Sequence, residues 1–69
     1  MRISARNQLR GTVTSIETGA VTSIVTIQLA GGEDVVSSIT KESVEMLHLA
    51  VGSPVLAVIK LSDVMVGTD

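Results

Sequence analysis

Apolar and polar residues alternate along two stretches in the first half of the chain, and this pattern predicts a β-hairpin. Residues 9–16 and 21–29 are rich in β-branched side chains, which favour strands. Residues 17–20, with the sequence Glu-Thr-Gly-Ala, supply the turn between them. Successive side chains of a strand point to opposite faces. The second strand should therefore have one apolar face, formed by Val21, Val25, Ile27 and Leu29.

The middle of the chain predicts a third strand followed by one short helix. Two glycines at residues 31–32 begin a second turn, and residues 34–39 form the next strand. Residues 40–47 are the only stretch with a helical pattern, and this stretch is long enough for two turns. Thr40 can act as the N-cap, and Glu42 suits the positive end of the helix dipole.

The last third of the chain adds two strands to this pattern. After a turn at residues 52–54, residues 55–60 are almost continuously apolar, as expected of a strand buried on both faces. Residues 63–66 predict a final short strand. The predicted fold class is therefore all-β, a five-stranded OB-like barrel with one short helix before the fourth strand.

Composition indicates that this fold assembles with copies of itself. A chain of 69 residues buries only about 60% of its unfolded surface, so its own core is marginal. The chain has no cysteine for disulfides, and its single histidine cannot build a zinc site. Yet 45% of the residues are hydrophobic and the mean hydropathy is +0.52. We expect the excess of apolar side chains to form the interfaces of a homo-oligomer.

Several classes of protein are disfavoured by the same features. No apolar run approaches the roughly 20 residues of a membrane span, and the first residues lack the apolar stretch of a signal peptide, so we expect a cytoplasmic protein without a membrane partner. The net charge of −2 disfavours a general binder of polyanions. His48 is the only imidazole, and no nucleophile motif accompanies it. We therefore expect a protein that is not an enzyme.

Residues that could hold a small anion occur in three places. A hydroxyl and a guanidinium, two residues apart near the N-terminus, would share one side of an extended segment. Two hydroxyls begin the predicted helix, where free N–H groups favour negative charge. A lysine ends the apolar strand at residues 55–60, with a serine two residues later, and a buried ammonium there would need water or a counter-charge. The candidate oxyanion-binding residues are Ser4, Arg6, Thr40, Ser43, Lys60 and Ser62.

Each candidate also has an ordinary interpretation. Arg6 and Lys60 could be surface charges, Thr40 a helix cap and Ser4 a turn former. Fifteen of the 69 residues are serine or threonine, so a single hydroxyl carries little information.

The run Ser4-Ala-Arg-Asn-Gln8, followed three residues later by Gly11, resembles the opening of the molbindin, or Mop, family. The resemblance continues through residues 30–32, 38–43, 52 and 58–60, and therefore covers essentially the whole chain as one domain, residues 1–69. It implies a small OB-like barrel that binds molybdate or tungstate between subunits, with no other cofactor and with metal present only as the oxyanion. It also implies a hexamer built as a trimer of dimers.

The resemblance further implies how the candidate residues are shared. It sets Ser4 and Arg6 of one subunit against Lys60, Thr40 and Ser43 of another. The family often has glycine at the position of His48, so the turn after the helix is expected to differ here.

Two alternatives remain beside this interpretation. One is an OB module that binds nucleic acid, although such surfaces stack bases on aromatic side chains and this chain has none. The other is a structural oligomerisation domain in which Arg6 and Lys60 form ordinary salt bridges between subunits.

Overall fold

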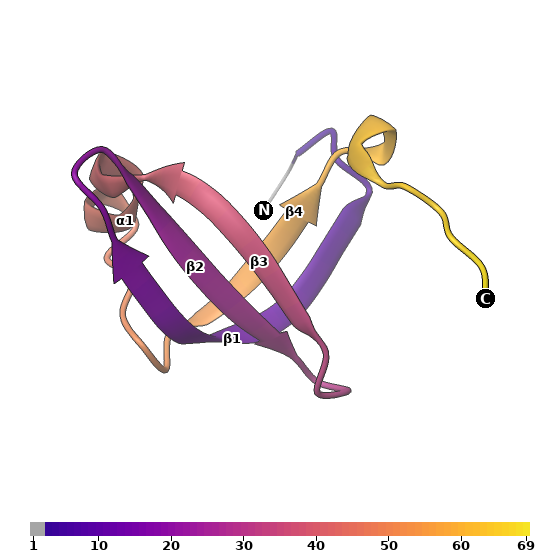
Figure 1. The fold of residues 1–69 in the computed structure, drawn as a ribbon, viewed down its shortest axis with the longest axis horizontal. Helices are drawn as coiled ribbons and strands as arrows, with labels where there is room; N and C mark the ends of the chain where they lie inside the picture. The colour runs from indigo at the N-terminus through magenta and orange to yellow at the C-terminus, as the bar shows by residue number, and fades with distance from the viewer. Residues whose placement is uncertain (1–2) are drawn as a thin grey trace.

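In the computed structural model, which describes residues 3–69, four antiparallel strands form one curled sheet (Figure 1). The strands are β1 (Asn7–Thr18), β2 (Thr22–Leu29), β3 (Asp34–Thr40) and β4 (Pro54–Ile59). Their order in the sheet is β3-β2-β1-β4, so β3 and β4 are its edges. The helix α1 (Lys41–Met46) connects β3 to β4, and a 3₁₀ helix, η1 (Leu61–Asp63), follows β4.

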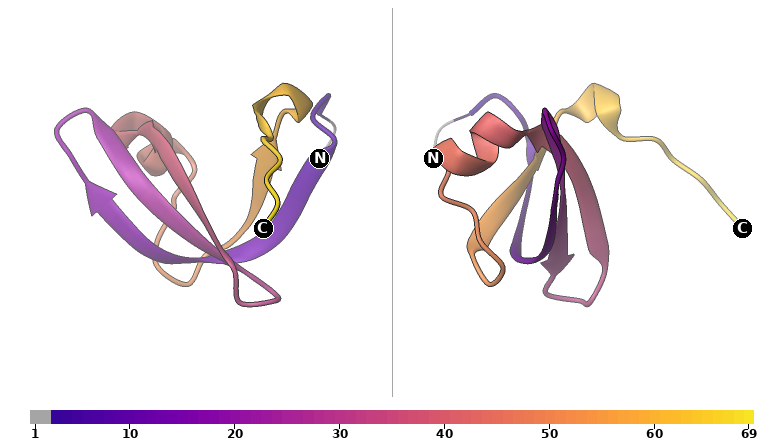
Figure 2. Two further views of the ribbon diagram at one scale, coloured as in Figure 1. Left: turned by 45° about the vertical axis from the view of Figure 1, so that its right-hand side comes forward. Right: turned by 60° about the vertical axis from the view of Figure 1, so that its left-hand side comes forward.

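The long strand β1 carries a β-bulge that allows the sheet to curl. Val13 pairs with Ile27 and Ser15 pairs with Thr26, which leaves Thr14 as an extra residue. The extra residue reverses the alternation of side chains, so that Val13 and Ile16, three positions apart, both pack in the core. Figure 2 shows the resulting arc of β1, whose first half also pairs with β4.

Gly11 lies where β1 and β2 approach closely. A Cβ atom at this position would be 2.6 Å from Ile27 Cγ2 and 2.7 Å from the Gln28 carbonyl oxygen. Such contacts are too short for a side chain, so the approach of the two strands requires glycine here.

The core of the described chain is small. Val13, Val25, Ile27 and Ala57 are its buried hydrophobic residues, and partly buried side chains surround them. Ser23 is also buried, and its Oγ has no hydrogen-bond partner among residues 3–69. A core of this size agrees with the expectation that the chain has apolar surface left over for contacts between copies.

The helix is confirmed, together with its cap. Thr40 Oγ1 accepts a hydrogen bond from Ser43 N at 3.0 Å. At the other end, Leu49 N donates to Val44 O and His48 N donates to Glu45 O, both at 3.1 Å. This pair of bonds is the Schellman arrangement, which usually places glycine where His48 stands. His48 has φ = +53°, so the histidine keeps the turn that glycine would form.

The all-β, OB-like fold and the helix before the fourth strand are confirmed, but the fifth strand is not formed. Residues 61–63 form η1 instead, and the chain then runs away from the sheet to the C-terminus (Figure 1). Met65 and Val66 are more than 90% exposed, at 94% and 91%. A short apolar strand needs a neighbour to pair with, and none of residues 3–69 pairs with this segment.

Two predictions of burial are also wrong. Val21 lies in the turn before β2 rather than on its inner face and is 72% exposed, whereas Ser23 is the buried residue at that end of the strand. β4 is not buried on both faces: Ala57 is its only buried residue. The reason is its position, because an edge strand has one neighbour and its outer face has no covering layer within residues 3–69.

Candidate oxyanion-binding site

Four of the six candidate residues lie at one end of the sheet. Asn7 and Ile59 form the last pair of the β1–β4 ladder, with Arg6 just before this pair and Lys60 just after it. A serine lies two residues beyond each cation on the same two segments. All four side chains are exposed, and we call them the strand-end set: Ser4, Arg6, Lys60 and Ser62.

The segment that leads into β1 is held by a side-chain hydrogen bond. Gln8 Nε2 donates to the Ala5 carbonyl oxygen at 3.0 Å. Burial alternates along this segment, since Ser4 and Arg6 are exposed while Ala5 and Asn7 are partly buried. This alternation agrees with the prediction that the Ser4 hydroxyl and the Arg6 guanidinium share one side.

The other two candidates, Thr40 and Ser43, lie at the start of α1 and form the helix-end set. The Thr40 hydroxyl donates to Ser43 Oγ at 2.8 Å, while Ser43 N donates back to Thr40 Oγ1 at 3.0 Å. A pair of hydroxyls has two protons to give, and this contact uses one of them. One hydroxyl proton of the helix-end set therefore remains for an outside acceptor.

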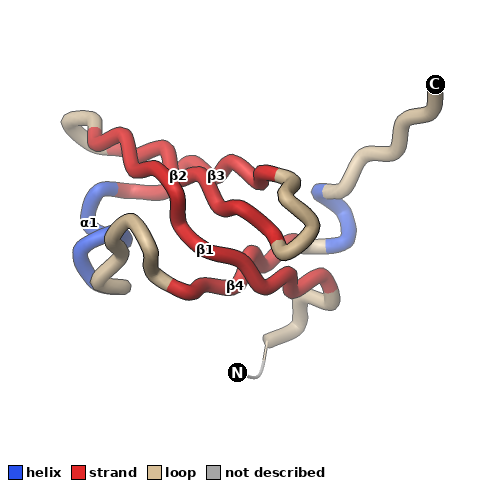
Figure 3. Tube along the Cα trace, turned by 90° about the horizontal axis from the view of Figure 1, so that it is seen from below, coloured by secondary structure: helices blue, strands red, loops and turns tan. Residues whose placement is uncertain are grey.

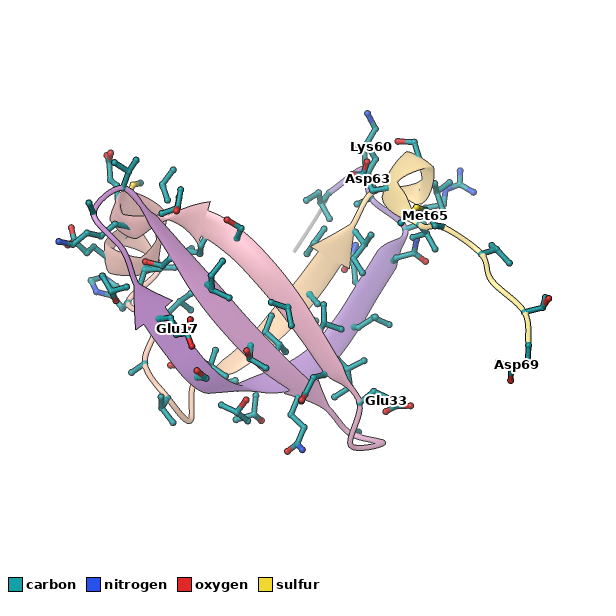
Figure 4. All side chains as sticks on the ribbon, in the orientation of Figure 1. Glu17, Glu33, Lys60, Asp63, Met65 and Asp69 are labelled. Atoms are coloured by element: carbon teal, nitrogen blue, oxygen red, sulfur yellow. The ribbon has the colours of Figure 1, made fainter. Side chains whose placement is uncertain are left out.

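The strand-end set and the helix-end set lie at opposite ends of the molecule. Figure 4 labels Lys60 at one end of the curled sheet, and α1 lies at the other end in Figure 1. The view of Figure 3 separates the same two regions, with α1 at one end and η1 near the other. The whole chain is 35 Å in its longest dimension, and the 12 residues of β1 run between the two ends.

This separation has a direct consequence for any shared site. A single tetrahedral oxyanion is too small to touch both ends of one chain. One subunit thus cannot give Lys60, Thr40 and Ser43 to the same anion, as the resemblance implied. Within a chain, Lys60 belongs with Ser4 and Arg6, and Thr40 belongs with Ser43.

One acidic residue, Asp63, lies close to Lys60 of the strand-end set. Asp63 N donates to the Lys60 carbonyl oxygen at 2.9 Å in the turn of η1, and Figure 4 shows the two residues at the same end of the sheet. Sequence reasoning placed Asp63 in a strand and missed this proximity, because it depends on the 3₁₀ turn after Lys60.

Two hollows among residues 3–69 are open or apolar, and neither is an enclosed anion site. An open groove of about 710 Å³ lies along β4 and is lined mainly by apolar residues, with Arg10 as its only charged one. A smaller hollow of about 150 Å³ inside the curl of the sheet is lined by apolar residues and one serine, Ser37. Within residues 3–69 no group of three or more His, Cys, Asp or Glu side chains could hold a metal cation. No helix of the described chain has the length and apolar character needed to cross a membrane.

The sequence matches the TOBE domain family over residues 3–66. The chain is also 48% identical, over all 69 residues and the full length of the relative, to a protein of Haemophilus influenzae named "Probable molybdenum-pterin-binding protein".

Two solved structures have the same fold. MopII from Clostridium pasteurianum, in an apo form, aligns with a TM-score of 0.92 and 43% identity, covering 97% of this chain and all of that one. A structure of the cytoplasmic molybdate-binding protein ModG, with molybdate bound, aligns with a TM-score of 0.84 and 53% identity. That alignment covers 87% of this chain and 43% of the ModG chain.

Proposed function

The chain belongs to the molbindin family of TOBE domains, and from this membership we propose that it binds molybdate or tungstate and stores it between copies of itself. The observation that carries the proposal is the 53% identity, at a TM-score of 0.84, to a structure that holds molybdate. The ligand of the chain would be the oxyanion itself, with Ser4, Arg6, Thr40, Ser43, Lys60 and Ser62 as its binding residues. Residues 1–69 would act as one molbindin-like domain.

The chemistry of the candidate residues supports this ligand. Molybdate and tungstate are tetrahedral dianions without protons at neutral pH, so they accept hydrogen bonds and donate none. The binding groups of the two sets are a guanidinium, an ammonium and hydroxyls, all of which can donate. Hydrogen phosphate carries a proton that needs an acceptor, and only the hydroxyl oxygens of the two sets could accept it, at the cost of a donor to the anion. Sulfate is the closer competitor, because it differs mainly in size.

The separation of the two sets supports a site shared between copies. A strand-end set supplies the charge, with Arg6 and Lys60, and a helix-end set can add the free hydroxyl proton of the Thr40–Ser43 pair. The two sets of one chain cannot meet, so an anion that uses both must join two chains. Binding would then stabilise the assembly, since the ligand favours the state that forms the site.

Exposed apolar residues support assembly as well. The C-terminal segment carries Val64, Met65 and Val66 with a strand-like pattern, and these side chains are exposed in the isolated chain. Pairing with another copy would give this segment a neighbouring strand and would bury its exposed apolar side chains. We infer a homo-oligomer, a hexamer arranged as a trimer of dimers, and a cytoplasmic location like that described for ModG. We assign it no catalytic role.

A molybdenum–pterin compound is the alternative ligand that the name of the Haemophilus influenzae relative suggests. A pterin is a flat aromatic ring, and proteins commonly hold such rings by stacking them on aromatic side chains. The chain contains no Phe, Tyr or Trp. The donor groups of the two sets therefore favour the inorganic oxyanion.

Equilibrium binding, measured by calorimetry, tests the proposal with molybdate, tungstate, sulfate and phosphate in turn, while sedimentation follows the size of the assembly. We expect molybdate and tungstate to bind comparably, sulfate more weakly and phosphate least, on a discrete oligomer. A well-folded monomer at micromolar concentration would contradict the inferred assembly. An oligomer that binds none of the four anions would favour a structural oligomerisation domain, and binding of single-stranded DNA or RNA would favour the OB module for nucleic acid.

A further inference from the structure

We propose that Gln8 is a positioning residue that holds Ser4 and Arg6 in the geometry needed to bind the oxyanion. The inference rests on the proposed function and adds a residue that does not itself touch the ligand. Its basis is the hydrogen bond from Gln8 Nε2 to the Ala5 carbonyl oxygen at 3.0 Å. Ala5 is the residue between Ser4 and Arg6, so this contact closes a short ring that contains Arg6 and anchors the residue that follows Ser4.

The loop has little other support. Ser4, Ala5 and Arg6 precede β1 and belong to no strand, so the ladder of the sheet does not fix them. Ala5 is partly buried, while the side chains on either side of it are exposed. A free segment of this kind loses conformational freedom when it binds a ligand, and that loss weakens binding. A hydrogen bond formed before the ligand arrives lowers this cost.

Gln8 is well placed to provide that bond. It is the second residue of β1, where pairing with Val58 of β4 holds its main chain. Its side chain reaches back three residues to the carbonyl of Ala5. That carbonyl belongs to the same planar peptide unit as the Arg6 N–H, so fixing its oxygen also fixes the direction in which Arg6 begins. The bond thus connects the ordered main chain of β1 to the peptide from which the Arg6 side chain starts.

Removal of the Gln8 amide tests the inference, with a second glutamine as a matched control. Gln28 is also exposed and lies on β2, away from residues 4–6. We expect Gln8→Ala to weaken molybdate binding by about three- to tenfold, the range that corresponds to one net hydrogen bond, and Gln28→Ala to leave it unchanged. Sedimentation of both variants should match the wild type.

A double-mutant cycle separates positioning from a general loss of structure. If Gln8 acts through Arg6, Gln8→Ala should cost much less affinity in a chain that already carries Arg6→Ala. Additive losses would overturn the inference. Equal losses in Gln8→Ala and Gln28→Ala would overturn it as well, because both would then reflect a general effect on the sheet.

A measurement without ligand keeps this test apart from that of the proposed function. In the ligand-free protein, ¹⁵N relaxation should show lower order parameters for Ala5 and Arg6 in Gln8→Ala than in the wild type or in Gln28→Ala. Unchanged order parameters would overturn the role of Gln8, whatever the ligand. A wild-type chain that shows this ordering but does not bind molybdate would overturn the proposed function, and with it the role of Gln8 in binding.

Discussion

Arg6 and Lys60 flank the final residue pair of the β1–β4 ladder, one just before β1 and the other just after β4. The two cations therefore reach the same end of the sheet from opposite directions along antiparallel strands. A guanidinium can give two parallel hydrogen bonds to one edge of a tetrahedral anion, while the lysine acts as a point charge.

We expect Arg6→Ala and Lys60→Ala each to weaken molybdate binding by roughly tenfold to a hundredfold, because each removes a charge-assisted hydrogen bond worth about 1.5–3 kcal/mol. Calorimetric titration at fixed ionic strength measures this loss. Arg10→Ala is the control, since it removes the same charge from a residue in the apolar groove on β4. Lys41 is less suitable, because it follows Thr40 directly. A similar modest loss in all the variants would indicate diffuse electrostatics in place of a site.

Removal of each of the two hydroxyls at the start of α1 should have a different effect. Ser43→Ala removes the hydroxyl whose proton is free for an outside acceptor but leaves the helix cap, so it should lower affinity with little effect on stability. Thr40→Ala removes the cap and should lower the free energy of unfolding by about 1 kcal/mol. Urea denaturation at one fixed protein concentration, followed by titration of each variant, distinguishes the effects. Thr40→Ser keeps the cap and should restore the stability.

Removal of the buried Ser23 hydroxyl should stabilise the fold. Its side chain is 1% exposed, and its Oγ lacks a hydrogen-bond partner within the described residues. Ser23→Ala removes a buried hydroxyl without a partner and should raise the free energy of unfolding by about 1 kcal/mol. Ser38→Ala, on an exposed position of β3, provides the comparison and should change stability little. A clear destabilisation by Ser23→Ala would mean that the hydroxyl has a partner, such as a buried water.

His48→Gly should also stabilise the protein. The backbone of His48 has φ = +53°, a region that costs a residue with a side chain about 1–2 kcal/mol. Glycine avoids this cost but gains freedom in the unfolded chain, so we expect a net gain of roughly 0.5–1 kcal/mol in the free energy of unfolding. His48→Ala keeps the strain and should show no gain. If both variants behaved alike in urea, the effect would come from loss of the imidazole.

The sequence was sufficient for the elements whose residues fit a local pattern, but not for contacts set by the whole sheet. Val25 and Ile27 are buried as the alternation predicted, and Thr40 caps α1. The bulge at Thr14 could not be predicted, because it depends on how β1 serves two neighbours at once. The pattern at residues 63–66 is typical of a strand, yet one chain contains no partner for it within residues 3–69.

The sequence supplied the candidate residues of the site but not their grouping in the fold. Ser4, Arg6, Lys60 and Ser62 are exposed, the Thr40–Ser43 pair keeps one free hydroxyl proton, and the role of all six residues in binding stays a prediction. Lys60 could not be assigned to the end of the sheet that holds Arg6 until the β1–β4 register was known. The register depends on tertiary pairing, which no run of neighbouring residues encodes.

The opposite placement of the strand-end set and the helix-end set has a consequence for the number of anions bound per chain. One chain has one set of each kind, so in any closed ring in which unlike ends meet, the number of anions equals the number of chains. The anion then behaves as a bivalent linker. At a large excess of molybdate, each end could hold an anion of its own, and the linker would no longer add to the cohesion of the ring. Occupancy of the sites and the degree of assembly would thus rise together while the anion is limiting. At high excess of anion, occupancy would stay high while assembly fell, which is the hook effect of a bivalent ligand.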